Sequence, residues 1–364
     1  MKVLYDYAAF LEQARGGVSR VMCELIKREI ARKDVDGQVF AGFHKNIEIN
    51  QLGRTFPGKI HGFLLPQILA KQRLFMPVNR SLFIPFARRF APDLCHYTYL
   101  QTPPVPEKTK VVITVHDLIG EIFNGAGKTR VTQDRKRTLE KADGIICVSE
   151  NTKADLLRFY KVGDKPVLVA HHGNSLRHTP VLAPNLPNAY FLYVGTRGAP
   201  YKNFDLLLRT FSHSAALKPY AIVCFGGEAF TQEELAAVKQ AGLANRVFHR
   251  QGSDEELAGY YQYSTALIYP SKYEGFGLPP IEAMGFGCPV VASSAPPMPE
   301  IIGDAALFFD PESVEQLLEA LTNLLTKNGV RGDLIERGKQ REQLFSWEKT
   351  SLQIHDFYRS LLGN

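Results

Sequence analysis

The feature that most constrains the fold is a regular alternation of short apolar runs with longer amphipathic segments. In the first half of the chain, runs typical of strands occupy residues 1–7, 111–115, 144–149 and 166–172. In the second half, they occupy residues 190–196, 220–227, 246–252, 265–271, 289–293 and 306–310. Short apolar strands that alternate with amphipathic helices predict parallel sheets covered by helices on both faces.

The alternation stops once and then restarts, which predicts two domains. The interruption is the proline-rich stretch TPVLAPNLPNA at residues 179–189, and the length of 364 residues is typical of two domains. We therefore expect an α/β protein with two doubly wound, Rossmann-like domains that face a cleft. The predicted domains are residues 1–178 and 188–344, and the amphipathic segment 345–364 is expected to pack back on the first domain.

Composition and cysteine placement favour a cytoplasmic protein. Hydrophobic residues make up 45% of the chain and charged residues 22%, and no apolar run reaches the length of about 20 residues that spans a membrane. The N-terminus has the pattern of a strand rather than of a signal peptide. Cys95, Cys147 and Cys224 lie in or beside apolar runs, and no CxxC pair occurs, which favours reduced, buried thiols over zinc or disulfides.

The net charge of +6 is unevenly distributed. Between Ile49 and Pro92 there is no acidic residue, although the stretch contains large apolar side chains and seven basic residues: Arg54, Lys59, Lys71, Arg73, Arg80, Arg88 and Arg89. One interpretation is peripheral contact with an anionic membrane. The other is an ordinary solvated helical face with a buried side. No nucleic-acid reader motif is present, so no nucleic acid is expected as a partner.

Ligands of parallel sheets bind at the carboxyl ends of strands, and glycines and cations occur at two such predicted ends. Gly16 and Gly17 open the first long helix, where exposed amides suit a phosphate, although an ordinary glycine turn is the alternative. Arg197 and Lys202 follow the strand at residues 190–196. They form a second candidate anion site or are solvated surface charges.

The stretch YEGFGLPPIEAMGFGCPVV, at residues 273–291, combines glycines with two carboxylates. The amides of Gly275 and Gly277 can meet a phosphate. Glu274 from the loop and Glu282 from the following helix would face one ligand, because carboxylates accept hydrogen bonds from sugar hydroxyls. Glu282 could instead be a partner of the helix dipole, but that interpretation does not explain Glu274 or the glycines.

A third candidate site follows the strand at residues 111–115, where His116 and Asp117 stand at its carboxyl end. Such a pair can position a hydroxyl or transfer a proton, or it can be a loop histidine with a capping aspartate. The stretch NGAGKT at residues 124–129 imitates a phosphate-binding loop but lacks its first glycine and a preceding strand, and no GxGxxG occurs. No histidine spacing indicates zinc.

Taken together, these motifs resemble the retaining glycosyltransferases of family 4, which have the GT-B fold. EGFGLPPIEAMGFGCPVVAS is similar to the donor-site signature of that family, in which seven residues separate two glutamates. RGGVSRV, TVHDL, CVSENTKADL, VGT…KNF and FSWEKT follow in the order of the family. The resemblance spans nearly all of the chain and looks most similar to mannosyl- and rhamnosyl-transferases of bacterial surface polysaccharide synthesis.

The resemblance implies a role for each matched residue. Lys202 would bind the donor diphosphate, Glu274 would contact the transferred sugar and Glu282 the ribose. Gly17, next to Gly16, would lie near the diphosphate, and His116 would face the reacting sugar. Backbone groups would hold sugar, phosphate and base at Phe276, Gly277, Leu278 and Val247. Many members place an arginine directly after the strand-end glycine, where this chain has Thr196, and Arg197, one position later, would serve as the second cation.

The function that this resemblance implies is a retaining transfer that needs neither metal nor cofactor. A hexose, mannose or similar, would move from a GDP-, UDP- or dTDP-linked nucleotide sugar to a saccharide or lipid-linked saccharide in polysaccharide or lipopolysaccharide synthesis. The expected place is the cytoplasm, with peripheral contact at the inner face of the cytoplasmic membrane as one interpretation. A non-catalytic GT-B binding subunit and a nucleotide-sugar epimerase are the open alternatives.

Overall fold

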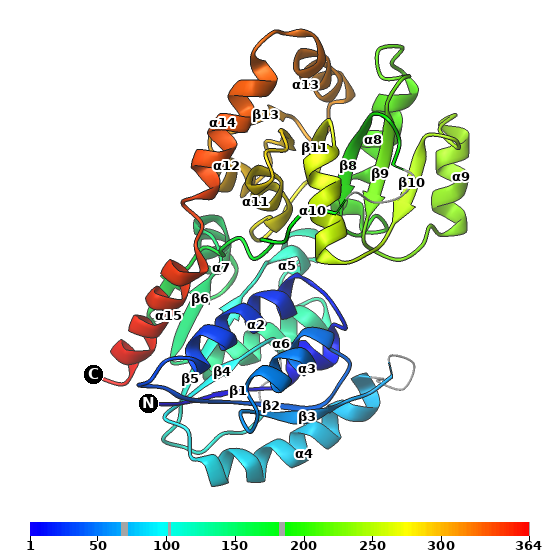
Figure 1. Ribbon diagram of the computed structural model, residues 1–364. Coiled ribbons are helices and arrows are strands. Elements are labelled where there is room, and N and C mark those ends of the chain that lie inside the picture. Colours follow the sequence, from blue (N-terminus) through cyan, green and yellow to red (C-terminus); the bar gives the residue numbers. More distant parts are fainter. Residues whose placement is uncertain (67–71, 101–102, 182–185, 364) are drawn as a thin grey trace. The chain divides into compact units, whose positions relative to one another are not determined.

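The computed structural model describes residues 1–66, 72–100, 103–181 and 186–363, and the chain divides into two compact units (Figure 1). The N-unit consists of Met1–Gly173 and Trp347–Asn364, and the C-unit consists of Asn174–Ser346. Part of the predicted proline-rich link, residues 182–185, lies outside the described residues.

The described part of the N-unit contains a seven-stranded sheet in the order β3-β2-β1-β4-β5-β6-β7, in which all neighbouring strands are parallel. The strands are β1 (Lys2–Tyr5), β2 (Asp36–His44), β3 (Ile60–Leu64), β4 (Leu94–Tyr97), β5 (Lys110–Val115), β6 (Gly144–Cys147) and β7 (Val167–Val169). The helices are α1 (Ala8–Glu12), α2 (Gly17–Ile30), α3 (Ile47–Thr55), α4 (Gln72–Phe90), α5 (Ile119–Asn124), α6 (Arg130–Lys141), α7 (Glu150–Phe159) and α15 (Trp347–Leu361).

Alternate residues of β1 show how helices come to cover both faces of this sheet. Val3 and Tyr5 pack in one core with the buried faces of α2 and α15. Leu4, which points the opposite way along the strand, packs in another core with the buried face of α4. The hydrophobic period of two in the strand thus fixes a three-layer arrangement.

The described part of the C-unit contains a six-stranded parallel sheet in the order β10-β9-β8-β11-β12-β13. The strands are β8 (Tyr190–Val194), β9 (Ala221–Phe225), β10 (Val247–Arg250), β11 (Ala266–Tyr269), β12 (Val290–Ser293) and β13 (Ala306–Phe309). The helices are η1 (Pro200–Lys202), α8 (Phe204–Ser212), α9 (Gln232–Gln240), α10 (Asp254–Tyr263), α11 (Leu278–Gly285), α12 (Met298–Ile302), α13 (Val314–Thr326) and α14 (Val330–Glu342).

The α/β class with two doubly wound parallel sheets is confirmed, although three strands were not predicted. All six predicted strands of the C-unit are present, and the four predicted in the first half are β1, β5, β6 and β7. The strands that the sequence analysis did not predict are β2, β3 and β4. β3 is an exposed edge strand inside the basic stretch, for which one interpretation was a helical face.

The division between the units falls earlier than the predicted limit at residue 178. The Asn174 side chain donates to Glu342 Oε1 at 3.0 Å, and Leu176 packs in a core cluster of the C-unit. Both residues therefore belong with the C-unit, which begins fourteen positions before the predicted residue 188. Helix α15 lies in the N-unit, where Ile354 and Tyr358 are buried against β1 and α2.

The order of each sheet places a topological switch point between two adjacent strands. In the N-unit, the chain runs outward in opposite directions from β1 and β4, and in the C-unit from β8 and β11. Ligands of open parallel sheets bind outside the carboxyl ends of the strands at such points. None of the described helices is both long enough and apolar enough to span a bilayer.

One buried histidine predicts that acid destabilises the N-unit. His96 Nδ1 lies 2.6 Å from Tyr358 Oη and Nε2 lies 2.8 Å from Thr114 Oγ1. Burial lowers the pKa of His96 to about 3. The unfolded chain therefore binds a proton that the folded state excludes, and the stability contributed by neutral His96 is lost as pH falls from about 6.5 towards 3.

The test compares unfolding of the wild type and His96→Gln at about pH 7 and about pH 5. We expect the stability gap between the two proteins to narrow by about 2 kcal/mol at the lower pH, because only the wild type has this histidine to protonate. Asp6, whose pKa burial raises to about 7, has the opposite pH dependence but is common to both proteins. An equal difference in unfolding free energy between the two proteins at both pH values would contradict a lowered pKa of His96.

Candidate functional site

The switch point of the C-unit brings together two loops that are far apart in the sequence. One loop follows β8 and leads through η1 to Lys202, and the other follows β11 and leads to α11. The amide of Lys272 donates to the carbonyl of Tyr201 at 2.7 Å. Asn203, in the left-handed conformation with φ 59°, donates from Nδ2 to the carbonyls of Pro270 and Pro311. These bonds fix the two loops against each other.

Lys202 and Glu274, both predicted site residues, meet across these loops. Lys202 Nζ lies 2.7 Å from Glu274 Oε1, and the two side chains are 16% and 10% exposed. The ammonium group also lies over the rings of Tyr201 and Tyr269, at 5.4 and 6.0 Å from their centroids. A cation in this setting is partly shielded from water yet accessible, so it can neutralise an anion strongly.

The glycine loop before α11 has a geometry that side chains would oppose. Gly277 has φ 103°, and a Cβ there would lie 2.8 Å from Met298 Cε. Phe276 is buried and packs edge-to-face on Phe345, with ring centroids 5.9 Å apart. Helix α11 begins at Leu278, so the amides of this turn are at a helix N-terminus, where anions are favoured.

Glu282 lies on α11 and is almost fully buried. The Tyr261 hydroxyl, on α10, donates to Glu282 Oε2 at 2.9 Å. Sequence reasoning did not find Tyr261, because nothing in the spacing of the two residues indicates that α10 and α11 pack together. This hydrogen bond orients the Glu282 carboxylate. Contact between Glu282 and a ribose stays a prediction.

Arg197 lies in a different environment from Lys202. Its guanidinium donates to the carbonyls of Gly226, at 3.2 Å, and of Glu228, and its Nε lies 3.3 Å from Glu234 Oε1. It also stacks over Phe230, at 4.5 Å from the ring centroid. Its charge is used to hold the loop that follows β9, and a phosphate would have to compete with these partners.

The predicted role of Val247 at the nucleotide base stays a prediction. Val247 is the first residue of β10, pairs with Ile222 of β9 and is buried. Ligands bind at carboxyl ends, and the carboxyl end of β10 is at Arg250, about 10 Å further along the strand.

In the N-unit, His116 and Asp117 directly follow β5, as predicted. His116 Nε2 is buried without a hydrogen-bond partner. Burial, and then the charge of Arg135, lower the pKa of His116 to about 3, so the imidazole is neutral at physiological pH. A neutral imidazole with an unused ring nitrogen can accept or donate one hydrogen bond to a ligand.

The surroundings of His116 include two further aromatic side chains. Its ring centroid lies 6.2 Å from that of His172, and the His172 ring is stacked on Trp347 of α15 at 5.6 Å. Burial lowers the pKa of His172 as well. The C-terminal helix therefore supports the carboxyl edge of the sheet in its own unit.

The two glycines at the start of α2 differ in what surrounds them. A Cβ at Gly16 would approach the flexible side chain of Gln13, whereas one at Gly17 would meet nothing within 4 Å. Neither residue has a left-handed backbone. Packing and strain thus leave the absence of a side chain at the exposed Gly17 unexplained, which is consistent with close approach of a ligand to the amide.

No group of metal-ligating side chains lies together among the described residues. What the structure offers instead at the C-unit switch point is one ammonium group, backbone amides at a helix N-terminus and two carboxylates. This set can bind an anion joined to a polyol, because the positive groups suit the anion and the carboxylates suit hydroxyls.

Family models match both halves of the chain. Glycosyltransferase Family 4 matches residues 15–177 and Glycosyl transferases group 1 matches residues 177–341. With two parallel-sheet units, these matches define the protein as a glycosyltransferase of the GT-B fold. Within that class, the chain belongs to glycosyltransferase family 4.

Relatives and solved structures agree with this assignment. The chain is 29% identical to O-antigen chain mannosyltransferase B of Escherichia coli, over 95% of this chain and 96% of that protein. It is 28% identical to O-antigen chain mannosyltransferase RfbU of Salmonella typhimurium, over 60% and 62% of the two chains. A sucrose-phosphate synthase from Thermosynechococcus elongatus superposes with a TM-score of 0.79 at 22% identity, covering 100% of this chain and 99% of that one. HepE of Anabaena, solved with UDP and glucose, superposes with 0.76 at 16% identity, covering 99% and 100%.

Proposed function

We propose that this glycosyltransferase moves a hexose, mannose or similar, from a nucleotide sugar to a saccharide or lipid-linked saccharide, with retention of the anomeric configuration. The observation that carries the proposal is the contact between Lys202 and Glu274 beside the glycine turn of α11. The names of the relatives, which are O-antigen mannosyltransferases, support mannose as the sugar and surface polysaccharide synthesis as the process.

The proposed chemistry depends on the charge that develops on the leaving diphosphate. As the bond to the sugar breaks, the leaving oxygen becomes more negative. Lys202 and the amides at the start of α11 would stabilise that charge without rearranging, an effect of several kcal/mol for fixed groups in sites that exclude water. When the phosphate takes over the positive charge of Lys202, Glu274 becomes available to accept hydrogen bonds from the hydroxyls of the sugar.

The remaining predicted residues have proposed roles of their own. Glu282, oriented by Tyr261, would accept from the ribose hydroxyls of the donor. Gly16 and Gly17 would admit the diphosphate to the N-terminus of α2, and His116 would orient the sugar or the acceptor hydroxyl. Arg197 would support the donor loop through its carbonyl contacts rather than bind phosphate directly.

Substitution of the ion pair tests the donor site. Lys202→Ala removes the proposed phosphate cation, and Glu274→Gln keeps the shape of the side chain while removing the charge that holds Lys202. We expect each change to lower kcat/KM by about a hundredfold or more, the usual effect of losing one group that stabilises charge in the transition state. The measurement is transfer of labelled sugar from a panel of nucleotide sugars.

Lys272→Ala is the matched control for Lys202→Ala. Lys272 stands in the same loop region and makes an ion pair of the same length, 2.7 Å, with Glu312, but the glutamate is 69% exposed. We expect activity near that of the wild type. Equal activity of the Lys202 and Lys272 variants would contradict the proposed site, and sugar nucleotide converted without any acceptor would favour an epimerase.

The proposal also predicts that transfer needs no divalent metal. A lysine and backbone amides would carry the charge compensation that a metal ion carries in other phosphate-releasing sites. Activity should therefore be unchanged after treatment with a chelator and gel filtration. Activity that disappears on chelation and returns with Mn²⁺ or Mg²⁺ would contradict it.

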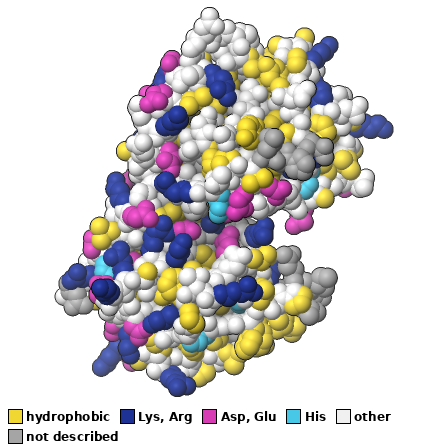
Figure 2. All heavy atoms as spheres, in the orientation of Figure 1, with side chains coloured by type: hydrophobic (Ala, Val, Ile, Leu, Met, Phe, Trp, Pro, Cys, Tyr) yellow, Lys and Arg dark blue, Asp and Glu magenta, His cyan; other side chains and the backbone are white. Residues whose placement is uncertain are grey.

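The membrane contact considered for residues 49–92 has a defined surface in the N-unit. Leu74, Val78 and Leu82 are spaced by one helical turn on α4 and are 60%, 39% and 47% exposed, and Phe63 of β3 is 71% exposed. Phe43 joins the two elements, since its ring lies 5.9 Å from that of Phe63 and 5.3 Å from that of Phe75. Figure 2 shows hydrophobic side chains gathered along the edge that α4 forms.

Charge favours an anionic bilayer as the partner of this apolar surface. The exposed basic residues on α4 are Arg73, Arg80, Arg88 and Arg89, and the helix has no acidic residue. Its opposite side is buried through Phe83, Ala87 and Phe90, so the exposed stripe is additional to normal packing. Each basic residue near an anionic surface contributes about 1 kcal/mol, and apolar side chains add to that by insertion.

Vesicle binding tests this surface. The triple variant Leu74→Ser, Val78→Ser, Leu82→Ser should bind vesicles rich in anionic phospholipid at least about tenfold more weakly than the wild type, because the inserted apolar area is removed. Leu235→Ser and Leu352→Ser, at exposed leucines of α9 and α15, are the controls. Failure of the wild type to sediment with anionic vesicles, or equal binding to neutral ones, would contradict the assignment.

A further inference from the structure

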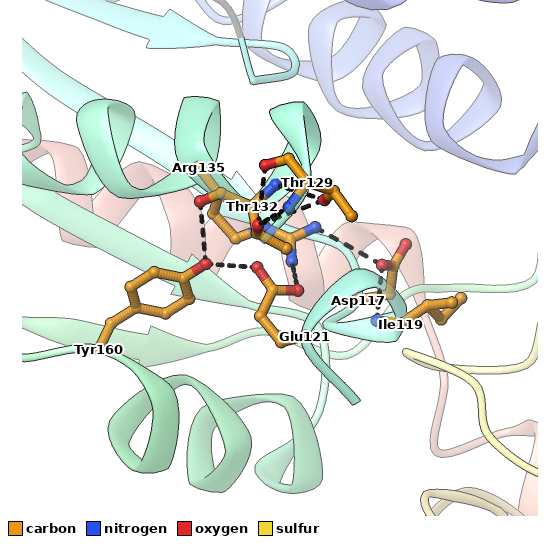
Figure 3. A network of polar contacts seen from close by, with 7 residues as sticks. All are labelled: Asp117, Ile119, Glu121, Thr129, Thr132, Arg135 and Tyr160. Atoms are coloured by element: carbon orange, nitrogen blue, oxygen red, sulfur yellow. Dashed lines mark hydrogen bonds and ion pairs between the residues drawn. The ribbon is translucent and has the colours of Figure 1, made fainter. Parts of the chain in front are cut away.

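A buried network of polar side chains in the N-unit reaches Asp117, the residue that follows His116 (Figure 3). Arg135 of α6 contacts Glu121 of α5, and its second terminal nitrogen lies 3.6 Å from Asp117 Oδ1. The Tyr160 hydroxyl donates to Glu121 and lies 3.1 Å from the carbonyl of Thr132. The side chain of Arg135 is 5% exposed and that of Glu121 is fully buried.

Holding two helices together with this network costs free energy of desolvation. Burial of an arginine and a glutamate removes both from water, and well-packed apolar residues often serve as well or better. The pair does not belong to a helix cap either, since Thr129 and Thr132 already form the capping box of α6. A reason other than stability is therefore needed for its position.

The position of Arg135 is distinctive because it faces the strand end that carries His116. Asp117 links the two: its Oδ1 accepts from the amide of Ile119 at 3.2 Å and pairs with Arg135. The turn between β5 and α5 is thereby fixed from both sides. Glu121 balances the charge of Arg135 and orients its guanidinium towards Asp117.

The charge that acts on His116, beside its burial, is that of Arg135 on α6. His96 on β4 and His172 after β7 are titratable neighbours, whose own pKa values His116 lowers. Asp117 follows His116 in the sequence and pairs with Arg135. Both other histidines have pKa values lowered by burial and are neutral. Arg135 is therefore the fixed positive charge that opposes protonation of His116, alongside its burial.

We propose that Arg135 is a positioning residue for glycosyl transfer, which holds Asp117 and the turn that carries His116. Neutral His116 can then use its buried, unpartnered Nε2 for one hydrogen bond to a hydroxyl of the sugar or the acceptor. Glu121 and Tyr160 act one step further away, by orienting Arg135. The inference rests on the proposed function, since His116 is its proposed contact with substrate.

Conservative and non-conservative changes at Arg135 separate position from charge. Arg135→Lys keeps the charge but loses the planar fork that reaches both carboxylates. The double variant Arg135→Gln with Glu121→Gln removes both charges and leaves no buried unpaired ion. Tyr160→Phe removes only the hydroxyl that orients Glu121. Arg130→Gln is the matched control, because Arg130 is on the same helix and is 84% exposed.

The kinetic measurement separates a positioning role from a structural one. We expect the double variant to lower kcat by about tenfold or more, since misplacing a group that contacts substrate by a small distance costs at least that much. Binding of the nucleotide should stay unchanged, because Lys202, Glu274 and Glu282, the proposed donor side chains, lie in the C-unit. The loss of kcat should be smaller in Arg135→Lys than in the double variant, and smaller still in Tyr160→Phe. The kcat of Arg130→Gln should match that of the wild type.

A second measurement does not need activity. Nitrogen chemical shifts of His116 at about pH 6 report whether the imidazole is neutral. We expect a neutral ring in the wild type and in Arg135→Lys, and a larger protonated fraction in the double variant. If the wild type transfers sugar but the folded double variant keeps full kcat and a neutral His116, the inference is overturned. If the double variant does not fold, full kcat and an unaltered His116 in both Arg135→Lys and Tyr160→Phe overturn it.

Failure of the proposed function would look different. In that case the wild type would transfer no sugar from any nucleotide donor, whereas the chemical shifts of His116 would still respond to Arg135. The two measurements thus distinguish an error in the assignment of Arg135 from an error in the reaction itself.

Discussion

The contact between Lys202 and Glu274 is the interaction on which the proposed donor site depends. The two residues are 72 positions apart and meet at 2.7 Å because β8 and β11 are neighbours in the sheet. That adjacency is the switch point of the C-unit, where the two halves of the sheet run away from each other and leave room for a ligand. The pair also explains how a lysine can be partly buried, because the Glu274 carboxylate balances its charge.

The same physical solution recurs at other strand ends. Glu282 is held by Tyr261, Asp117 by Arg135, and Asn203 holds two carbonyls from separate loops. Buried polar groups are costly unless they are paired, so each partner fixes a side chain in one orientation. Sites built in this way are rigid before a ligand arrives, which lowers the reorganisation needed during the reaction.

Much of the fold and part of the site could be predicted from the sequence. Apolar runs such as those of β8 and β11 are short, continuous and bounded by turns, and the glycine-rich signature with its two glutamates is local in the chain. β3 was missed because an exposed edge strand lacks the apolar run of a buried one. The position of Val247 as the first residue of β10 could not be predicted either, because an apolar run does not show at which residue a strand begins.

The sequence by itself determined the alternation of strand and helix, the division into two units and the chemical character of the loops. Those properties depend on neighbours in the chain, through hydrophobic periodicity and turn residues. Only the tertiary structure decided that Lys202 pairs with Glu274, that Arg197 turns to the carbonyls after β9, and that Arg135 pairs with Asp117 beside His116. Strand order and helix packing set these pairings, and residues distant in sequence carry no local sign of them.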